Sequence, residues 1–174
     1  DAALGLARSD GLEQLSMTVY DDPAFFDEMV TTVADCILAV LQETLASGVQ
    51  FDACGMWEDM AYNAGPLLSP RHFKKYLVHH YRRIADLCHR YGVDIIWLDC
   101  DGKIDALLPL WLDAGINCMF PLEIGTWGAD PVKYRQIYGK ELLLMGGFDK
   151  HILAQSKADI EREINRLAPL VEEG

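Results

Sequence analysis

The segment VDIIWLDCDGKIDALLPLWLDAGINCMFPLE, residues 93–123, decides the fold class. It begins with a short apolar run that ends at Asp99, and a second apolar run begins at Ile116. Between the two runs, apolar residues recur at helical spacing over residues 104–112, and the pattern stops before Gly115. A strand, a helix and another strand in this order predict a βαβ unit whose two strands are parallel.

The same order of strand and helix recurs along the rest of the chain. Four short apolar runs lack the strict alternation of a half-buried strand, which predicts parallel strands with both sheet faces covered. Between them, apolar residues recur at spacings of three and four, which predicts helices. The expected strands are residues 49–57, 93–99, 116–123 and 141–149, and the expected helices follow Pro23, Pro70, Gly102, Pro131 and Ser156.

Four strand–helix units are too few for a closed sheet. A dinucleotide-binding fold would need a glycine-rich loop after its first strand, and CGMWEDM at residues 54–60 does not supply one. An open four-stranded sheet also exposes two strand edges, which natural proteins avoid. The sequence therefore predicts an α/β fold of the (β/α)8 barrel type, in which residues 1–174 form one domain with about half of the barrel.

Helix starts carry a repeated local signal, a side-chain acceptor followed by proline. Asp22, Ser69 and Asp130 each precede a proline, as expected of an N-cap followed by the first helical residue. Ser156 and Asp159 have the spacing of a capping box before the last helix. These pairs predict where four of the helices begin.

The charge balance excludes some classes of function. The chain has 27 acidic and 15 basic residues and a net charge of −12, so it lacks the basic surface that nucleic acids and anionic membranes require. No apolar run has the length of a membrane span, and residues 1–11 lack the order of a secretory signal. The scattered cysteines contain no CxxC pair and favour a reduced, cytoplasmic protein. Cys36, Cys54 and Cys118 lie in apolar patterns and are expected in the core.

Each predicted strand is followed by at least one carboxylate. Because the carboxyl ends of parallel strands meet at one rim, we expect these side chains to gather there. They are Glu58 and Asp59 after the first strand, Asp99 and Asp101 after the second, Glu123 after the third, and Asp149, followed by Lys150, after the fourth. His151 lies near the same rim, whereas the other histidines follow Pro70 and are expected at the surface.

Two kinds of role are open for these carboxylates. If they converge, crowding raises the pKa of some of them or a cation neutralises them, which gives a general acid or a Lewis acid. Asp99 and Asp101 offer oxygen ligands for a hard ion such as Mg²⁺ or Mn²⁺, while the Cys100 thiol between them is expected to be buried and inert. Alternatively, Asp99 and Asp101 cap the next helix, Glu123 pairs with a neighbouring cation, and Asp149 caps a short helix.

Four blocks of sequence carry a family resemblance: YDDPAFFDEMV (20–30), WEDMAYNAGPLLSPRHFKKYLVHHYRRI (57–84), DIIWLDCDGKIDALLPLWLDAGINCMFPLEI (94–124) and LLLMGGFDKHILAQSKADIEREI (142–164). In order and spacing they are similar to the C-terminal half of the uroporphyrinogen decarboxylase superfamily, from about Leu12 to Gly174. The resemblance implies a (β/α)8 barrel and one of two chemistries. One is cofactor-free decarboxylation of uroporphyrinogen, and the other is zinc-dependent methyl transfer between methylated substrates, corrinoid proteins and thiols.

Departures from the family's motifs bear on this choice. In the methyltransferases, the strand that matches residues 93–98 ends in a His-x-Cys pair of zinc ligands, and this chain has Asp99 and Asp101 there. In the decarboxylases, the arginines and the aspartate that meet the substrate lie in the half of the barrel before the matching segment. Asp101-Gly102 and residues 146–150 most resemble uncharacterised decarboxylase-like proteins that occur with corrinoid methyl-transfer systems.

The leading hypothesis is a cytoplasmic enzyme of this cobamide-linked methyltransferase-like branch that acts on a small neutral or cationic substrate. Its partner would be a corrinoid protein. The catalytic groups would be Asp99, Asp101 and Glu123, and Asp99 and Asp101 could also bind a divalent metal ion (Zn²⁺, Mg²⁺ or Mn²⁺). The substrate site would be lined by Glu58, Asp59, Asp149 and Lys150.

Two alternatives stay open. A true uroporphyrinogen decarboxylase of porphyrin biosynthesis would need no metal or cofactor, but its substrate carries many carboxylates that an acidic rim repels. Each like-charge contact at about 4 Å costs on the order of 4 kcal/mol at an effective dielectric constant of about 20. A non-catalytic half-barrel could instead close its sheet by forming a homodimer.

Overall fold

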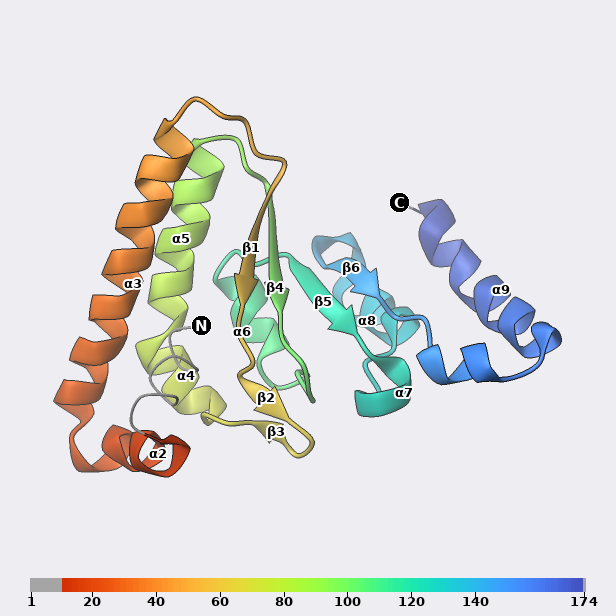
Figure 1. Cartoon of the computed structure of the whole chain (residues 1–174), viewed down its shortest axis with the longest axis horizontal. Coiled ribbons are helices and arrows are strands. Elements are labelled where there is room, and N and C mark those ends of the chain that lie inside the picture. The colour runs from red at the N-terminus through yellow and green to blue at the C-terminus, as the bar shows by residue number, and fades with distance from the viewer. Residues whose placement is uncertain (1–10, 174) are drawn as a thin grey trace.

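The computed structural model describes residues 11–173, and its centre is a four-stranded parallel sheet. The strands lie in the order β1-β4-β5-β6, so β1 and β6 form its two edges (Figure 1). Their bounds are Ala53–Trp57 for β1, Ile95–Asp99 for β4, Cys118–Leu122 for β5 and Leu143–Gly146 for β6. Residues 1–10, most of the segment judged unlike a secretory signal, lie outside the described residues.

Helices alternate with these strands, as in half of a (β/α)8 barrel. The predicted fold class is therefore confirmed. The helices are α2 (Leu12–Asp21), α3 (Pro23–Ala46), α4 (Pro70–Tyr76), α5 (Val78–Arg90), α6 (Leu108–Asp113), α7 (Ile124–Trp127), α8 (Pro131–Tyr138) and α9 (Lys157–Glu173). A hairpin of β2 (Ala61–Tyr62) and β3 (Gly65–Pro66) and the 3₁₀ turns η1 (Gly139–Glu141) and η2 (Lys150–Ala154) complete the described chain.

The capping residues act as the sequence predicts. The side chain of Asp22 accepts a hydrogen bond from the Phe25 N–H at 3.0 Å, and Ser69 and Asp130 do the same at the starts of α4 and α8. Ser156 and Asp159 form the reciprocal bonds of a capping box, with the Ser156 N–H donating to Asp159 Oδ2 at 3.1 Å. Local side-chain chemistry thus determines these four helix starts.

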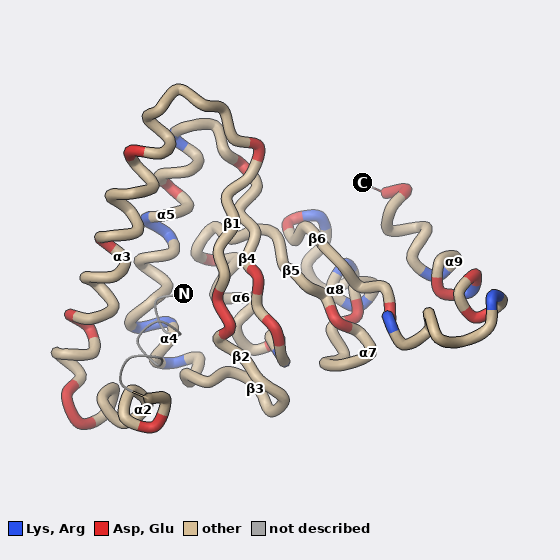
Figure 2. The backbone as a smooth tube through the Cα atoms, in the orientation of Figure 1, with Lys and Arg blue, Asp and Glu red and all other residues tan. Residues whose placement is uncertain are grey.

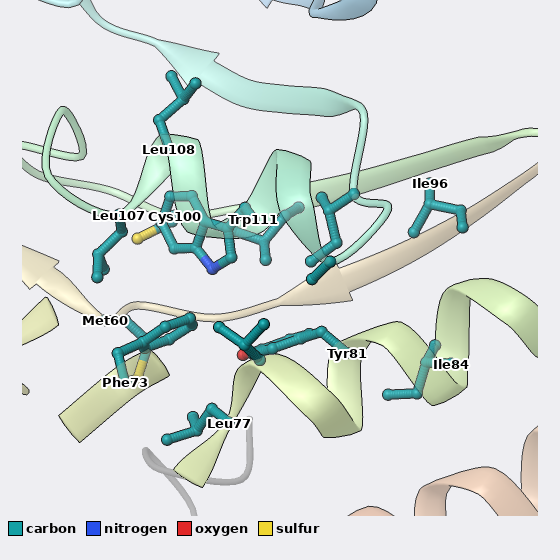
Figure 3. Packing of buried hydrophobic residues seen from close by; sticks show 14 of the residues in the cluster. Met60, Phe73, Leu77, Tyr81, Ile84, Ile96, Cys100, Leu107, Leu108 and Trp111 are labelled. Carbon is teal, nitrogen blue, oxygen red and sulfur yellow. The ribbon is translucent and has the colours of Figure 1, made fainter. Parts of the chain in front are cut away.

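The hydrophobic core lies on the helix-covered face of the sheet. Phe73 of α4 packs against Tyr81 of α5 and Trp111 of α6, with ring centroids 5.6 and 6.1 Å apart (Figure 3). Ile96 and Leu98 reach this core from β4 and are fully buried. Burying each such aliphatic side chain contributes about 1.5–3 kcal/mol, so this face holds the sheet and the helices together.

The opposite face of the sheet is open, so the prediction that both faces are covered is wrong for the described residues. Trp57 of β1, Ile95 of β4 and Met145 of β6 are 49%, 39% and 40% exposed. They alternate along their strands with residues that face the helices, such as Ile96. The helices described above all pack on the other side or beyond the sheet edges (Figure 1).

Several local predictions are corrected. The helix after Pro70 divides at Leu77 into α4 and α5, and the helix after Gly102 begins only at Leu108. Cys36 is exposed although its neighbours are apolar. His80 is buried because α3 packs along α5 and covers it, so it does not lie at the surface.

Candidate active site at the strand ends

The carboxyl ends of β1, β4 and β5 place three side chains in one row on the open face of the sheet. Trp57 pairs in register with Asp99, and Asp99 pairs with Phe120. Side chains at matching positions of neighbouring parallel strands point to the same face. Asp99 therefore lies between two aromatic residues, at the end of the central strand pair.

Asp59 is held beside this row by two hydrogen bonds. The Trp57 Nε1–H donates to Asp59 Oδ2 at 3.1 Å, and the backbone N–H of Asp101 donates to Asp59 Oδ1 at 3.2 Å. The acidic segments after β1 and β4 consequently lie side by side (Figure 2). The second of these bonds fixes the position of Asp101 relative to β1.

Gly102 allows the Asp101 turn to lie directly on the hairpin. Its φ is 97°, and a Cβ at this position would approach the carbonyl carbon of Ala61 to 2.6 Å. The Lys103 N–H donates to the Tyr62 carbonyl at 3.1 Å and continues the contact. Only glycine combines this φ with so close a backbone approach.

The two aspartates of this turn have raised pKa values. Burial raises the pKa of Asp99, and the negative charges of Asp101 and Asp59 add to the effect. Burial also raises the pKa of Asp101, together with Glu123 and Asp59, while Lys150 opposes the shift. The expected crowding of carboxylates is therefore present, and both groups retain a proton to higher pH than an isolated aspartate.

Glu123 has the opposite character because it is paired. Its carboxylate accepts hydrogen bonds from Lys150 Nζ and from the Trp127 indole N–H. Burial by itself would raise the pKa of Glu123, but these two bonds together with the positive charges of Lys150 and His151 outweigh burial and lower it. The predicted alternative that Glu123 pairs with a neighbouring cation is thus confirmed.

A pocket of about 270 Å³ opens between the ends of β5 and β6. Its polar lining comes from Glu123 and Lys150, and its apolar lining includes Leu122 and Phe148. Its full lining is Pro121, Leu122, Glu123, Ile124, Gly125, Thr126, Gly146, Gly147, Phe148 and Lys150. The strand ends therefore combine neighbouring carboxylates, those of Asp59, Asp99 and Asp101, with a pocket beside them. Binding sites in α/β folds commonly have such a concave surface with a few polar groups.

The comparison with protein families fits this geometry. The family model for Uroporphyrinogen decarboxylase (URO-D) matches residues 4–171. The chain belongs to the URO-D family. Searches of curated proteins and of solved structures returned no match.

This URO-D family chain brings together most of the carboxylates expected at its rim. Asp59, Asp99, Asp101 and Glu123 interact with one another or with Lys150. Asp149 lies nearby but caps η2, accepting from the His151 N–H at 3.0 Å and contacting His151 Nδ1 at 2.9 Å. The predicted capping role of Asp149 is therefore confirmed.

Glu58 lies on the other side of the sheet. It is buried on the helix-covered face, in a small cavity that Tyr81 and His80 of α5 and Val30 of α3 also line. Burial raises the pKa of Tyr81, and the Glu58 carboxylate raises it further. Glu58 follows Trp57 directly, and this alternation turns it away from Asp99.

Helix capping does not explain Asp99 and Asp101. The next helix, α6, begins at Leu108, and its N-cap Leu107 makes no side-chain capping bond. Several residues of turn separate both carboxylates from this helix. That alternative from the sequence is wrong, and a role of the pair at the rim stays a prediction.

The URO-D family resemblance raises the question of a metal at Asp99 and Asp101. Within residues 11–173, no group of three or more His, Cys, Asp and Glu side chains is arranged to hold an ion. Cys100 points to the buried side, where its thiol donates to the Asp101 carbonyl at 3.4 Å and burial raises its pKa to about 12. The described residues therefore do not form a metal site of three or more ligands, and metal binding by the two aspartates stays a prediction.

Aromatic residues at the strand ends are the part of the site that the sequence analysis missed. The Trp97 and Phe120 rings meet edge to face with centroids 5.8 Å apart, and the Tyr62 and Trp127 rings lie 6.4 Å apart. Trp57 ends its strand just before Glu58, so its position in the sequence could have pointed to it.

In the part of the chain that the structure describes, no helix is both long and apolar enough to cross a bilayer.

Proposed function

We propose that the chain forms the C-terminal half of the barrel of a URO-D family enzyme from the cobamide-linked methyltransferase-like branch. Its substrate would be a small neutral or cationic methylated compound, and its partner a corrinoid protein in the cytoplasm. One observation carries the proposal: Asp59, Asp99 and Asp101 act on one another at the strand ends, and the neighbouring Lys150 is paired with Glu123.

The charge at this rim disfavours a substrate with many carboxylates. Uroporphyrinogen would meet three carboxylates here, and the nearby Lys150 is already bound by Glu123. Each like-charge contact at about 4 Å costs on the order of 4 kcal/mol at an effective dielectric constant of about 20. A methylated amine or a methoxylated compound carries no such penalty.

Asp101 would act as a general acid when the leaving group needs a proton. When a methyl group passes from a neutral methoxylated compound or a neutral amine to a nucleophile, the oxygen or nitrogen keeps the electron pair of the broken bond and is stabilised by a proton. A methylated ammonium group leaves as a neutral amine and needs no proton. Asp101, whose pKa is raised, can donate this proton from its carboxyl group. A corrinoid, when bound, would supply the acceptor for the methyl group. Asp59 would position Asp101 through its bond to the Asp101 N–H.

An activity assay tests this proposal. The purified protein would be incubated with reduced cobalamin and a panel of methylated amines and methoxylated compounds, and cobalamin methylation followed by absorbance. With a neutral methoxylated compound, Asp101→Asn should lower the rate by about 10²–10⁴-fold, whereas Asp113→Asn, on the exposed side of α6, should not. Decarboxylation of uroporphyrinogen without methyl transfer would contradict the proposal and support the true decarboxylase.

The open sheet face favours a second candidate, a non-catalytic half-barrel that dimerises. Trp57, Ile95 and Met145 are exposed on that face, and a second copy could cover them and pair the edges of β1 and β6. Size-exclusion chromatography with light scattering would test this candidate. A monomer at concentrations of about 100 μM would exclude a dimer with an affinity in the low micromolar range.

A further inference from the structure

The open face of the sheet carries a group of aromatic rings around one carboxylate. Trp57 and Phe120 flank Asp99 in the strand register. Trp97, two residues before Asp99 on the same strand and face, meets Phe120 edge to face at 5.8 Å with an interplanar angle of 87°. We call Trp57, Trp97, Asp99 and Phe120 the aromatic row.

Gly55 makes room for this arrangement. It pairs in register with Trp97, and a Cβ at Gly55 would overlap the Trp97 indole ring. The Trp97 ring therefore lies over Gly55 of β1. Every other residue type would displace the ring, so the glycine is a structural requirement of the aromatic row.

Within residues 11–173, the charges that act on the Asp99 carboxyl group are negative. The charged side chains that act on its carboxyl group are those of Asp101 and Asp59. Lys150, the cation near Asp101, is bound to Glu123 on the neighbouring strand end. The aromatic row therefore combines aromatic rings with negative charge, and both attract a positively charged ligand.

We propose that the aromatic row binds the methylated ammonium group of a substrate, with Asp99 as its counter-ion and the Trp57 and Trp97 rings as its walls. This inference rests on the proposed function and names the substrate class of the same site. Methylated ammonium groups are weakly hydrated and spread their charge over their methyl groups, so aromatic faces bind them well. A methoxylated neutral compound would gain nothing from Asp99.

Four tryptophans make the binding test direct. The protein would be labelled with ¹⁵N, and its four indole N–H signals followed while tetramethylammonium chloride is added. The signals of Trp57 and Trp97 should move, and that of Trp111, buried in the core, should not. Neopentyl alcohol, which has a similar shape and no charge, should bind at least about tenfold more weakly.

Two variants and one control decide the result. Asp99→Asn should weaken tetramethylammonium binding about tenfold, and Trp57→Leu several-fold, while Asp113→Asn should bind as the unchanged protein does. Equal binding of neopentyl alcohol, equal shifts with sodium chloride, or unchanged affinity in both variants would overturn the inference. The dispersion of the backbone amide signals shows whether each variant is folded.

The tetramethylammonium titration measures binding without catalytic turnover. Its result can therefore be distinguished from the result of the methyl-transfer assay. Binding of tetramethylammonium without any methyl transfer would contradict the proposed function and leave the inference standing. Methyl transfer from a neutral methoxylated compound, without ammonium binding, would support the proposed function and overturn the inference.

Discussion

Asp99 and Asp101 are separated by one residue at the end of β4, and they share a negatively charged neighbourhood with Asp59. Burial and repulsion raise the pKa of both groups. Glu123, at the end of the next strand, has a lowered pKa because Lys150 and Trp127 donate to it. Neighbouring carboxylates with opposite pKa shifts can divide the roles of proton donor and fixed charge.

Removing one of these charges should change the titration of the other. In Asp101→Asn, Asp99 loses the repulsion from Asp101 but keeps burial and the repulsion from Asp59, so the pKa of Asp99 should fall part of the way toward that of an isolated aspartate. Side-chain ¹³C NMR of labelled aspartate, recorded between pH 2 and pH 8, would measure this change. Asp113→Asn serves as the control, and an unchanged Asp99 titration in Asp101→Asn would refute the coupling.

Asp59 should depend on Trp57 for its position. Trp57→Phe keeps an aromatic ring but removes the indole N–H that donates to Asp59 Oδ2. Losing one such exposed bond should reduce stability by about 0.5–1.5 kcal/mol. Urea unfolding would measure the change, and a loss above about 3 kcal/mol would mean that the ring itself is essential to the fold.

The turns that follow the strands position the residues of the candidate site as much as the strands do. The turn after β4 reaches the hairpin through Gly102, and Gly125 at α7 lets the Asp149–His151 pair lie directly against it. A Cβ at Gly125 would overlap both of these side chains. Small residues at these two contacts therefore bring the ends of β1, β4, β5 and β6 together.

Gly102→Ala should be more harmful than an alanine at a comparable glycine. Gly92, in the turn after α5, also has a positive φ, but a Cβ there would meet nothing within 4 Å. Both substitutions incur backbone strain of about 1–2 kcal/mol, and Gly102→Ala adds the overlap with Ala61, about 1–3 kcal/mol more. Urea denaturation of both variants would measure the difference, and equal losses would show that the hairpin yields freely.

The packing of α3 on α5 should depend on pH through His80. Burial lowers the pKa of His80, helped by the positive charges of His79 and Arg83 and opposed by Asp35 and Asp27. As the pH falls, His80 of the unfolded chain binds its proton near pH 6.5, whereas His80 of the folded protein binds it only at a lower pH. Its stabilising contribution is therefore complete above the pKa of the unfolded chain and is lost as the pH falls through the folded pKa.

Urea midpoints at pH 7.5 and pH 5.5 test this dependence. The unchanged protein should lose stability on acidification, by up to about 1.4 kcal/mol per pH unit for one proton. His80→Gln should lose less, whereas His89→Gln should behave as the unchanged protein does. Identical slopes for all three proteins would remove His80 as the cause.

Across the whole molecule, the sequence predicts what depends on local chemistry or on topology. Helix starts follow from capping pairs such as Asp22-Pro23, and the gathering of carboxylates follows from parallel strands that end at one rim. The sheet face to which the Glu58 side chain points depends on the alternation of side chains between the two faces, which starts from Trp57. The residue types at the strand end do not reveal this direction. Apolar residues such as Ile95 indicate a buried environment without identifying the segment that provides it.

The order of strands in the sheet is also their order along the chain, since β4, β5 and β6 each join the strand formed before them. Among the described strands, β1 gains its first neighbour when β4 emerges about 40 residues later, and each later strand then joins an edge that is already formed. The sheet can therefore grow in one direction as the ribosome extends the chain. The β1–β4 pair closes the longest loop between neighbouring described strands, so we expect its formation to be the slowest of the three pairings.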